Sequence, residues 1–388
     1  MARPSENSID MIRRLVGYDT TSRDSNMPLI DWVRDYLAGH GVDSTLIRDD
    51  TGTKANLFAT LGPQDPPGIC LSGHTDVVPV DGQDWDSDPF DLTEKDGRLY
   101  GRGTCDMKGF LAIALALVPE FQRRGLQTPL HLAMSHDEEV GCRGVPHMLA
   151  RFGDGLPRPA MCIVGEPTSM KVVRGHKGKK AFRCDVHGVE AHSSLAPTAV
   201  NAIEYAAEIV AFLRRMARRK REEGPLDDGY DIAHTTIQTG VIRGGTAINI
   251  VPRHCSFEFE FRVVPADDPY TLFEEVRRFA TEELEPEMRA VHPESRIDFT
   301  LISGYPGLDT VEDDPVVALA KRLTGANSTY KVAFGTEAGL FQQAEVPTVV
   351  CGPGSIDQAH KPNEFVSLDQ LAQCEHMMKR LMEQMCRN

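Results

Sequence analysis

The feature that most constrains this chain is a series of short apolar runs that end close to ionisable residues. Runs such as 69–73 (ICLSG) and 130–135 (LHLAMS) have the length of buried strands and lie between turn residues. They alternate with segments such as Met107–Gln122, in which apolar residues recur at helical spacing. Strands that alternate with helices predict an α/β fold whose functional side chains lie on loops beyond the strand ends.

The pattern changes near Gly178 to strand, helix, two strands, helix and strand, and the α/β rhythm resumes from Val316. The inserted order is typical of a ferredoxin-like α+β domain. We therefore expect a catalytic domain of residues 1–177 and 305–388, interrupted by a smaller domain of residues 178–304. The elements expected in the insert are Ala181–His187, Asn201–Met216, Thr235–Arg243, His254–Val263, Tyr270–Glu283 and Ile297–Ile302.

Composition supports this organisation and excludes several classes of protein. The chain has 388 residues, of which 41% are hydrophobic, so it is longer than a single core usually grows. Its net charge of −15 disfavours binding to nucleic acid or to anionic membranes. No run is long enough to span a membrane, the N-terminus lacks the apolar core of a signal peptide, and the nine cysteines form no CxxC pair. We expect a cytoplasmic protein.

Two candidate metal-binding segments lie in the first third of the chain. His74 and Asp76 follow the second apolar run, and side chains two residues apart on an extended chain point the same way. Asp106 directly precedes the helix expected from Met107, although aspartate is also a common helix N-cap. The glycines around Asp106 match neither GK[ST] nor GxGxxG, which excludes a phosphate-binding loop.

Three further segments carry ionisable residues at the ends of apolar runs. Glu138 and Glu139 follow the run 130–135, Glu166 ends another run, and His360 follows a Gly/Pro loop. Each segment alone is also typical of a surface loop or of a structural residue. Together they form a set of carboxylates and imidazoles that suits zinc, cobalt or manganese. An aspartate can bridge two ions, and a glutamate that is not needed as a ligand can act as general base.

The sequence resembles the M20 family of dinuclear zinc hydrolases, which includes aminoacylases and acetylornithine deacetylases. The segments SGHTDVVP, GRGTCDMKG, SHDEEVG, GEPT and GPGSIDQAH resemble the metal-binding and catalytic motifs of the family, in the same order. The resemblance covers essentially the whole chain and implies a mixed sheet flanked by helices, with an inserted lid and dimerisation domain. GTEAGLFQ (335–342) and PGSIDQAHKPNE (353–364) resemble the acetylornithine deacetylase version more than the succinyl-diaminopimelate desuccinylase version.

The resemblance implies two zinc ions per subunit, with cobalt or manganese as substitutes. Five side chains would hold them: His74 and Glu166 on one ion, Glu139 and His360 on the other, and Asp106 between the two. Asp76 would be the carboxylate behind His74, and Glu138 would be the general base.

The resemblance also implies contacts with the substrate and with a second subunit. His192 would donate to the oxyanion across a homodimer interface, with a turn histidine as the alternative. Asn249 and Arg262 match lid positions that contact substrate, although Arg262 on an alternating strand also suits a structural ion pair. Glu337 would meet the free amine of the substrate.

The implied reaction is hydrolysis of N2-acetyl-L-ornithine to L-ornithine and acetate, a step of arginine synthesis. The alternatives with the same chemistry are a succinyl-diaminopimelate desuccinylase, an aminoacylase or a metallo-carboxypeptidase, all acting on small N-acyl amino acids or peptides. A non-catalytic binding scaffold would be expected to lack a ligand or the base, yet all of these residues are present. A Ser/His/Asp hydrolase has no GxSxG segment to support it.

Overall fold

The computed structural model describes residues 2–65 and 67–386, and the chain forms two compact units. The first consists of Met1–Gly175, Leu308–Lys331 and Thr336–Asn388, and the second of His176–Gly307 and Val332–Gly335. From the sequence, residues 332–335 are expected in the catalytic domain. The structure groups them with the insert because they pack on it: a Cβ atom at Gly335 would lie 2.0 Å from Cε2 of Tyr305.

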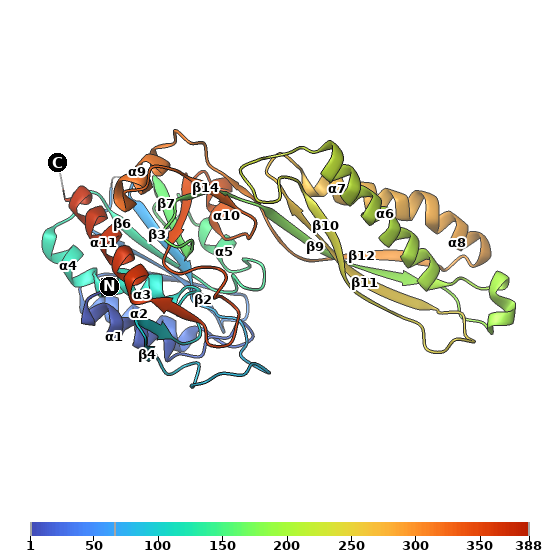
Figure 1. Cartoon of the computed structure of the whole chain (residues 1–388), viewed down its shortest axis with the longest axis horizontal. Coiled ribbons are helices and arrows are strands. Elements are labelled where there is room, and N and C mark those ends of the chain that lie inside the picture. Colours follow the sequence, from blue (N-terminus) through green and yellow to red (C-terminus); the bar gives the residue numbers. More distant parts are fainter. Residues whose placement is uncertain (1, 66, 387–388) are drawn as a thin grey trace. The chain divides into compact units, whose positions relative to one another are not determined.

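A mixed sheet forms the centre of the first unit (Figure 1). Its strands are β1 (Ser44–Arg48), β2 (Ala55–Leu61), β3 (Ile69–His74), β6 (Leu130–Ser135), β7 (Met161–Pro167), β8 (Val173–His176), β13 (Leu308–Asp309), β14 (Tyr330–Val332) and β15 (Thr348–Gly352). The order is β1-β2-β6-β3-β7-β15-β8-β13, with β14 paired to β8. The four central strands β6, β3, β7 and β15 are parallel, so their carboxyl ends meet at one edge. A separate small sheet has the order β16 (Phe365–Ser367), β5 (Arg98–Tyr100) and β4 (Thr93–Lys95).

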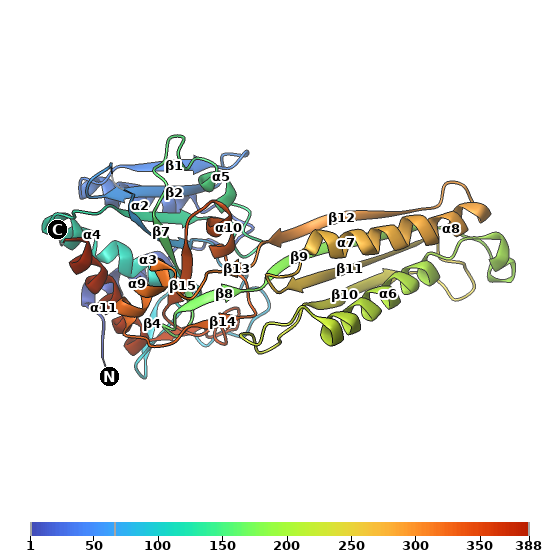
Figure 2. The same cartoon turned by 90° about the horizontal axis from the view of Figure 1, so that it is seen from above.

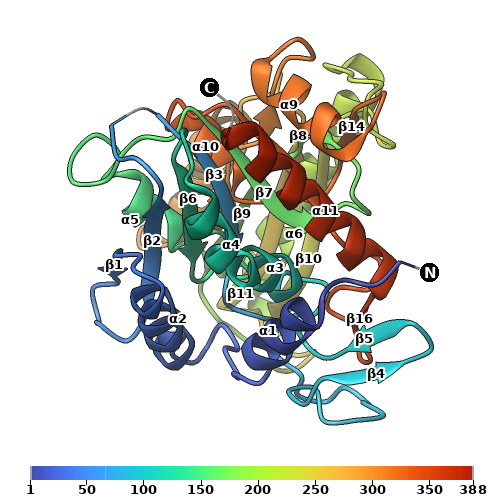
Figure 3. The same ribbon diagram turned by 90° about the vertical axis from the view of Figure 1, so that its left-hand side faces the viewer.

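Helices cover this sheet because its central strands are apolar on both faces. Every residue of β3 and β6 is buried, as expected of parallel strands. One core joins the sheet to α1 (Glu6–Val16), α2 (Met27–Gly39), α3 (Lys108–Ala116), α4 (Val118–Arg124), α9 (Pro315–Thr324) and α11 (Leu368–Met385). Figure 3 shows α3, α4 and α11 lying over the strands. The short helices α5 (Val145–Leu149) and α10 (Ala338–Gln343) also contact the sheet.

The predicted α/β fold with a mixed sheet flanked by helices is confirmed, with one local correction. The single helix expected over Met107–Gln122 is two helices, α3 and α4. The break lies at Leu117 because Pro119 cannot continue a helix from inside it and instead starts a new one. All nine cysteines are free, and all except Cys386 are buried. Among the described residues, none of the helices has the length and apolar character needed to cross a bilayer.

The second unit is an antiparallel sheet of order β10-β11-β9-β12 that carries its helices on one face (Figure 2). Its elements are β9 (Gly178–His187), η1 (Ser193–Thr198), α6 (Ala202–Glu223), β10 (Thr236–Gly244), β11 (His254–Val263), α7 (Pro269–Arg278), η2 (Phe279–Leu284), α8 (Glu285–Val291) and β12 (Arg296–Tyr305). The succession of strands and long helices is the ferredoxin-like one expected from the sequence. Alternate residues of β11 are buried and form the core with α6 and α7.

We expect the aromatic core of the second unit to carry much of its stability. Phe259 is buried in β11 and stacks on Phe182 with 5.6 Å between ring centroids. Phe259→Ala should therefore lower the free energy of unfolding by about 3–5 kcal/mol, measured by urea denaturation. Leu301→Ala is the control in the same sheet, because Leu301 is exposed and its removal should change stability by about 0.5 kcal/mol or less. Equal effects of the two substitutions would contradict this packing.

Candidate metal centre

The shared edge of the four parallel strands gathers all the side chains predicted to bind metal. His74 is the last residue of β3, and Glu166 is the last but one of β7. The others lie on loops: Glu138 and Glu139 after β6, His360 after β15, and Asp106 just before α3.

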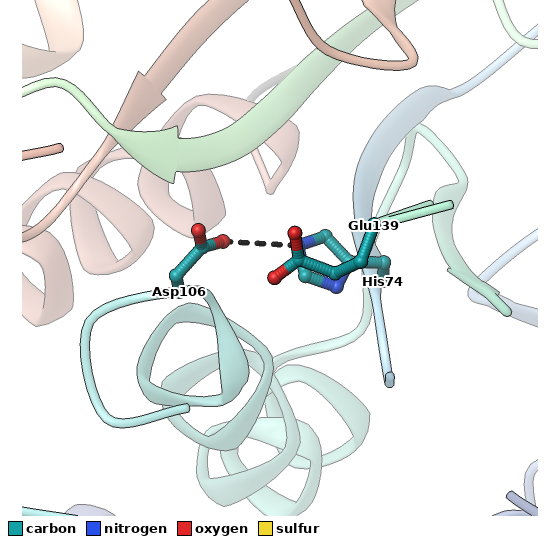
Figure 4. Close-up of side chains that lie close together, drawn as sticks. All are labelled: His74, Asp106 and Glu139. Atoms are coloured by element: carbon teal, nitrogen blue, oxygen red, sulfur yellow. Dashed lines mark hydrogen bonds and ion pairs between the residues drawn. The ribbon is translucent and has the colours of Figure 1, made fainter. Parts of the chain in front are cut away.

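Asp106 lies between two histidines and presents one oxygen to each. Its Oδ1 is 3.0 Å from Nε2 of His74, and its Oδ2 is 3.3 Å from Nε2 of His360. A glutamate completes each side: Glu166 Oε1 is 3.6 Å from His74 Nε2, and Glu139 Oε2 is 2.9 Å from His360 Nε2. Figure 4 shows Asp106, His74 and Glu139 converging on one space.

Two groups of donor atoms are compact enough to hold an ion. The ligand atoms of His74, Asp106 and Glu139 all lie within 4.8 Å of one another, and so do those of His74, Glu138 and Glu166. Nitrogen and carboxylate oxygen donors at such spacing are the ligand types that zinc and related transition metals take.

Two glycines allow Asp106 to approach the strand ends so closely. A Cβ atom at Gly73 would lie 2.4 Å from Cε of Met107, and one at Gly165 would lie 2.0 Å from Cγ of Phe110. Each glycine directly precedes a candidate ligand, and both contacts come from the start of α3 or the residue before it. The first turn of α3 can therefore lie directly against β3 and β7, which brings Asp106 to His74.

Asp76 supports the centre differently from what the sequence analysis expects. Its backbone carbonyl, not its carboxylate, makes the close contact with Nδ1 of His74, at 2.8 Å, while its Oδ1 lies 3.6 Å away. The carboxylate accepts instead from the backbone nitrogens of Glu138 (3.1 Å) and Glu139 (3.3 Å) and from the hydroxyl of Ser22 (2.7 Å). Asp76 thus orients the His74 ring and also anchors the loop that carries both glutamates.

The electrostatics of the centre call for cations. Burial raises the pKa of Glu138 to about 8 and that of Glu139 to about 7, and neighbouring carboxylates add to both shifts. Burial also raises the pKa of Glu166 well above its usual range, with Asp106 as the next cause. Hydrogen bonds to Asp106 and Glu139 raise the pKa of His360 to about 10. A metal cation competes with protons for the same lone pairs, so these residues fit divalent metal ions.

A carboxylate oxygen of Glu138 lies within 4.8 Å of a ring nitrogen of His74, and its Oε1 has a close hydrogen-bond donor. The thiol of Cys142, four residues further on, donates to Oε1 of Glu138 at 3.2 Å. A buried carboxylate with a raised pKa beside a metal-ligand set is suited to accept and release a proton near neutral pH.

Glu337 lies in the same unit, but its carboxylate is already occupied. Its side chain is fully buried, with Oε1 accepting from the Ser72 hydroxyl and Oε2 from the Ser135 hydroxyl, both at 2.6 Å. Burial raises the pKa of Glu337. Because Ser72 is in β3 and Ser135 in β6, this carboxylate joins the ends of the two strands that carry His74 and the glutamate loop.

The remaining predicted residues belong to the second unit. His192 is exposed, and its Nδ1 lies 2.8 Å from the hydroxyl of Ser194. Asn249 is also exposed, and its carbonyl accepts from the backbone nitrogen of Ser193 at 2.9 Å. Arg262 is half-buried and forms the ion pair with Glu260 (3.1 Å) that the sequence analysis gives as its alternative role, and it also donates to the hydroxyl of Tyr305 (2.8 Å).

Sequence reasoning missed a buried ion pair beside the centre. Arg102 Nη1 donates to Glu364 Oε2 at 2.8 Å, and both side chains are 1% exposed. Both residues lie in segments already singled out, GRGTCDMKG and PGSIDQAHKPNE. The sequence signal for this pair is an arginine and a glutamate within these two segments. Charge alone does not show whether two such residues form a buried ion pair or lie in solvent.

Comparison with known proteins identifies the family of this chain. The model of Peptidase family M20/M25/M40 matches residues 70–384. An acetylornithine deacetylase from Myxococcus xanthus is 36% identical over 380 residues, which cover 97% of this chain and 96% of the relative.

Solved structures share the fold at low sequence identity. An M20 family metallo-carboxypeptidase from Sulfolobus solfataricus has a TM-score of 0.76 and 18% identity and covers 98% of this chain and 99% of its own. A dinuclear metal-binding peptidase of the M20 family from Bacillus subtilis has a TM-score of 0.62 and 15% identity. The match covers 97% of this chain and 96% of that structure.

The family match and the convergent set of carboxylates and imidazoles identify the chain as a hydrolase. It belongs to the M20 peptidase family.

We expect the metal-free protein to lose stability as pH rises from 6 to 8. Glu138 and Glu139 have pKa values of about 8 and about 7 in the folded chain, above the value of 4.5 for a free glutamate. The folded state therefore binds more protons than the unfolded state in this interval. Each such group contributes stability that is full below pH 4.5 and is lost through its folded pKa, at about 1.4 kcal/mol per pH unit.

Thermal unfolding of chelator-treated and zinc-loaded protein at pH 6, 7 and 8 measures this dependence. Zinc should remove most of the decline, and Glu138→Gln should reduce it in the metal-free protein. Metal-free protein whose stability rises over the same interval would contradict the assignment.

Proposed function

We propose that the protein hydrolyses N2-acetyl-L-ornithine to L-ornithine and acetate with two zinc ions per subunit, as a cytoplasmic step of arginine synthesis. The observation that carries the proposal is Asp106 with one oxygen toward His74 and the other toward His360, beside the buried carboxylate of Glu138. The acetylornithine deacetylase relative, similar over nearly the full chain, supports the choice of substrate.

In this proposal, His74 and Glu166 would hold one ion and Glu139 and His360 would hold the other, with Asp106 as a ligand available to both. When bound, zinc supplies Lewis acidity toward a carbonyl oxygen and toward water, and cobalt or manganese can replace it. The dinuclear metal-binding relative from Bacillus subtilis supports a count of two.

The protein's own residues move the proton. A carboxylate oxygen of Glu138 takes a proton from the attacking water and passes it to the departing amine nitrogen of ornithine. Burial and neighbouring carboxylates raise the pKa of Glu138 in the metal-free chain, and divalent cations nearby would lower it again, so this carboxylate can act as the base in the metal-loaded protein. Asp76 holds the Glu138 backbone in place, because its Oδ1 accepts from the backbone nitrogen of Glu138 at 3.1 Å.

The second unit supplies substrate contacts in a homodimer. His192 of the partner subunit would donate to the oxyanion, which its exposed ring in this chain permits. Asn249 and Arg262 would contact the substrate, Arg262 exchanging part of its pairing with Glu260 for the substrate carboxylate. We assign Glu337 to holding β3 and β6 together in place of a contact with the substrate amine, because both of its oxygens already accept from serines.

The proposed base predicts a specific loss of activity. Glu138→Gln should lower acetate release from N2-acetyl-L-ornithine by about 10²–10⁴-fold while zinc content stays at the wild-type level, since Glu138 is not assigned as a ligand. Glu345→Gln is the matched control, because Glu345 is exposed and pairs with Arg158 at the surface. N-succinyl-L,L-diaminopimelate is the parallel substrate. Turnover of this compound alone would overturn the substrate, and an active Glu138→Gln enzyme would overturn the base.

The proposed role of His192 predicts complementation between two inactive chains. Glu138→Gln and His192→Ala homodimers should both be nearly inactive. A heterodimer of the two, isolated with two affinity tags, contains one site with an intact Glu138 and an intact partner histidine. It should recover about half of the wild-type activity. An inactive heterodimer, or a chain that is monomeric by light scattering, would contradict a shared site.

A further inference from the structure

A buried carboxylate outside the ligand set holds the loop that ends in Asp106. Glu364 Oε1 accepts from the backbone nitrogens of Cys105 at 2.8 Å and Asp106 at 3.0 Å. Its Oε2 accepts from the backbone nitrogen of Gly103 at 2.9 Å and from Arg102 Nη1 at 2.8 Å. Charge-assisted hydrogen bonds on both oxygens fix the carboxylate and, with it, the path of the loop.

The same network reaches His360. Arg102 Nη2 donates to Oε1 of Gln83 at 2.6 Å, and Nε2 of Gln83 donates to the carbonyl of His360 at 3.0 Å. Arg102 Nη1 also reaches the carbonyl of Lys361 at 3.4 Å. His360 depends on such support, because its side chain is 52% exposed and its backbone has a φ of 62°, in the left-handed region.

The opposite side of the centre is held by other means. His74 ends a fully buried strand, and the carbonyl of Asp76 contacts its Nδ1 at 2.8 Å. Glu166 lies within β7 and is buried as well. Neither of these two residues shares a hydrogen bond with Glu364, Arg102 or Gln83 among the contacts of the described chain.

We propose that Glu364 is a positioning residue that sets the relative placement of Asp106 and His360, directly for Asp106 and through Arg102 and Gln83 for His360. The proposal rests on the two-ion centre of the proposed function. It assigns Glu364 an unequal effect on the two ions. The ion held by Glu139 and His360 would lose the placement of both Asp106 and His360, whereas the ion held by His74 and Glu166 would lose only the placement of the shared Asp106.

Stepwise zinc binding to the full-length Glu364→Gln protein tests the selectivity. The metal-free protein is titrated with zinc against a chelator of known affinity, and the two binding constants are compared with those of the wild type. We expect one constant to weaken by about 10–100-fold and the other to change far less, as for partners that orient metal ligands elsewhere. The measurement needs no substrate, so it is independent of the proposed reaction.

Glu375→Gln is the matched control. Glu375 is also a buried carboxylate, but it accepts from the backbone nitrogen of Ser5 at 2.7 Å and from the hydroxyl of Ser8 at 2.9 Å, joining α11 to α1. Its loss should cost stability without changing either zinc constant. If Glu364→Gln does not fold, Gln83→Ala keeps Glu364 on the Asp106 loop and removes the link to His360, together with the acceptor for Arg102 and Trp85, and should weaken the same constant to a smaller extent.

Unchanged constants in Glu364→Gln, or equal weakening of both, would overturn the positioning role. A wild-type protein that binds a single ion would instead contradict the two-ion centre. The role of Glu364 would then still predict weaker binding of that ion than in Glu375→Gln, and equal binding by the two variants would overturn it.

Discussion

Negative charge buried at the carboxyl edge of four parallel strands is the constraint on which the first unit depends. A carboxylate taken out of water must be compensated by a cation or by hydrogen-bond donors. The structure uses both solutions. Asp106, Glu139 and Glu166 face imidazoles, whereas backbone nitrogens, hydroxyls and one guanidinium satisfy three further carboxylates of this region, Asp76, Glu337 and Glu364.

These two groups of carboxylates are interdependent. Two of the donors to Asp76 are the backbone nitrogens of Glu138 and Glu139, so one buried acid holds the segment that presents two others. Glu364 acts in the same way on the loop that ends in Asp106. A ligand set assembled from loops of different strands therefore has a definite shape before any ion binds, which reduces the ordering cost of binding.

The sequence predicts the fold class and the positions of the candidate ligands because both depend on local patterns. An apolar run of strand length followed by His74 or Glu138 shows in the linear sequence where a strand ends and which side chain follows it. Contacts over long sequence separations lack such a pattern. The hydrogen bond from Ser72 to Glu337, 265 residues away, depends on how β3 lies relative to the start of α10. No local pattern shows this contact, so the sequence alone suggests a contact of Glu337 with the substrate. The sequence also cannot show that the backbone carbonyl of Asp76 supports the His74 ring. Only the backbone geometry decides whether the carbonyl or the carboxylate of Asp76 contacts Nδ1 of His74.

The attachment of the insert has a consequence for how such a chain can be rearranged. The insert begins after β8 and ends before β13, and these two strands are neighbours in the large sheet. Within the insert, Lys179 and Tyr305 are likewise paired across adjacent strands, so its two ends lie together. A short turn from β8 to β13 could replace the whole insert without rethreading the sheet. The imidazoles and acids of the candidate metal centre would remain, whereas His192 and Asn249 would leave with the excised segment, so the candidate metal ligands and the proposed substrate contacts occupy separable stretches of the sequence.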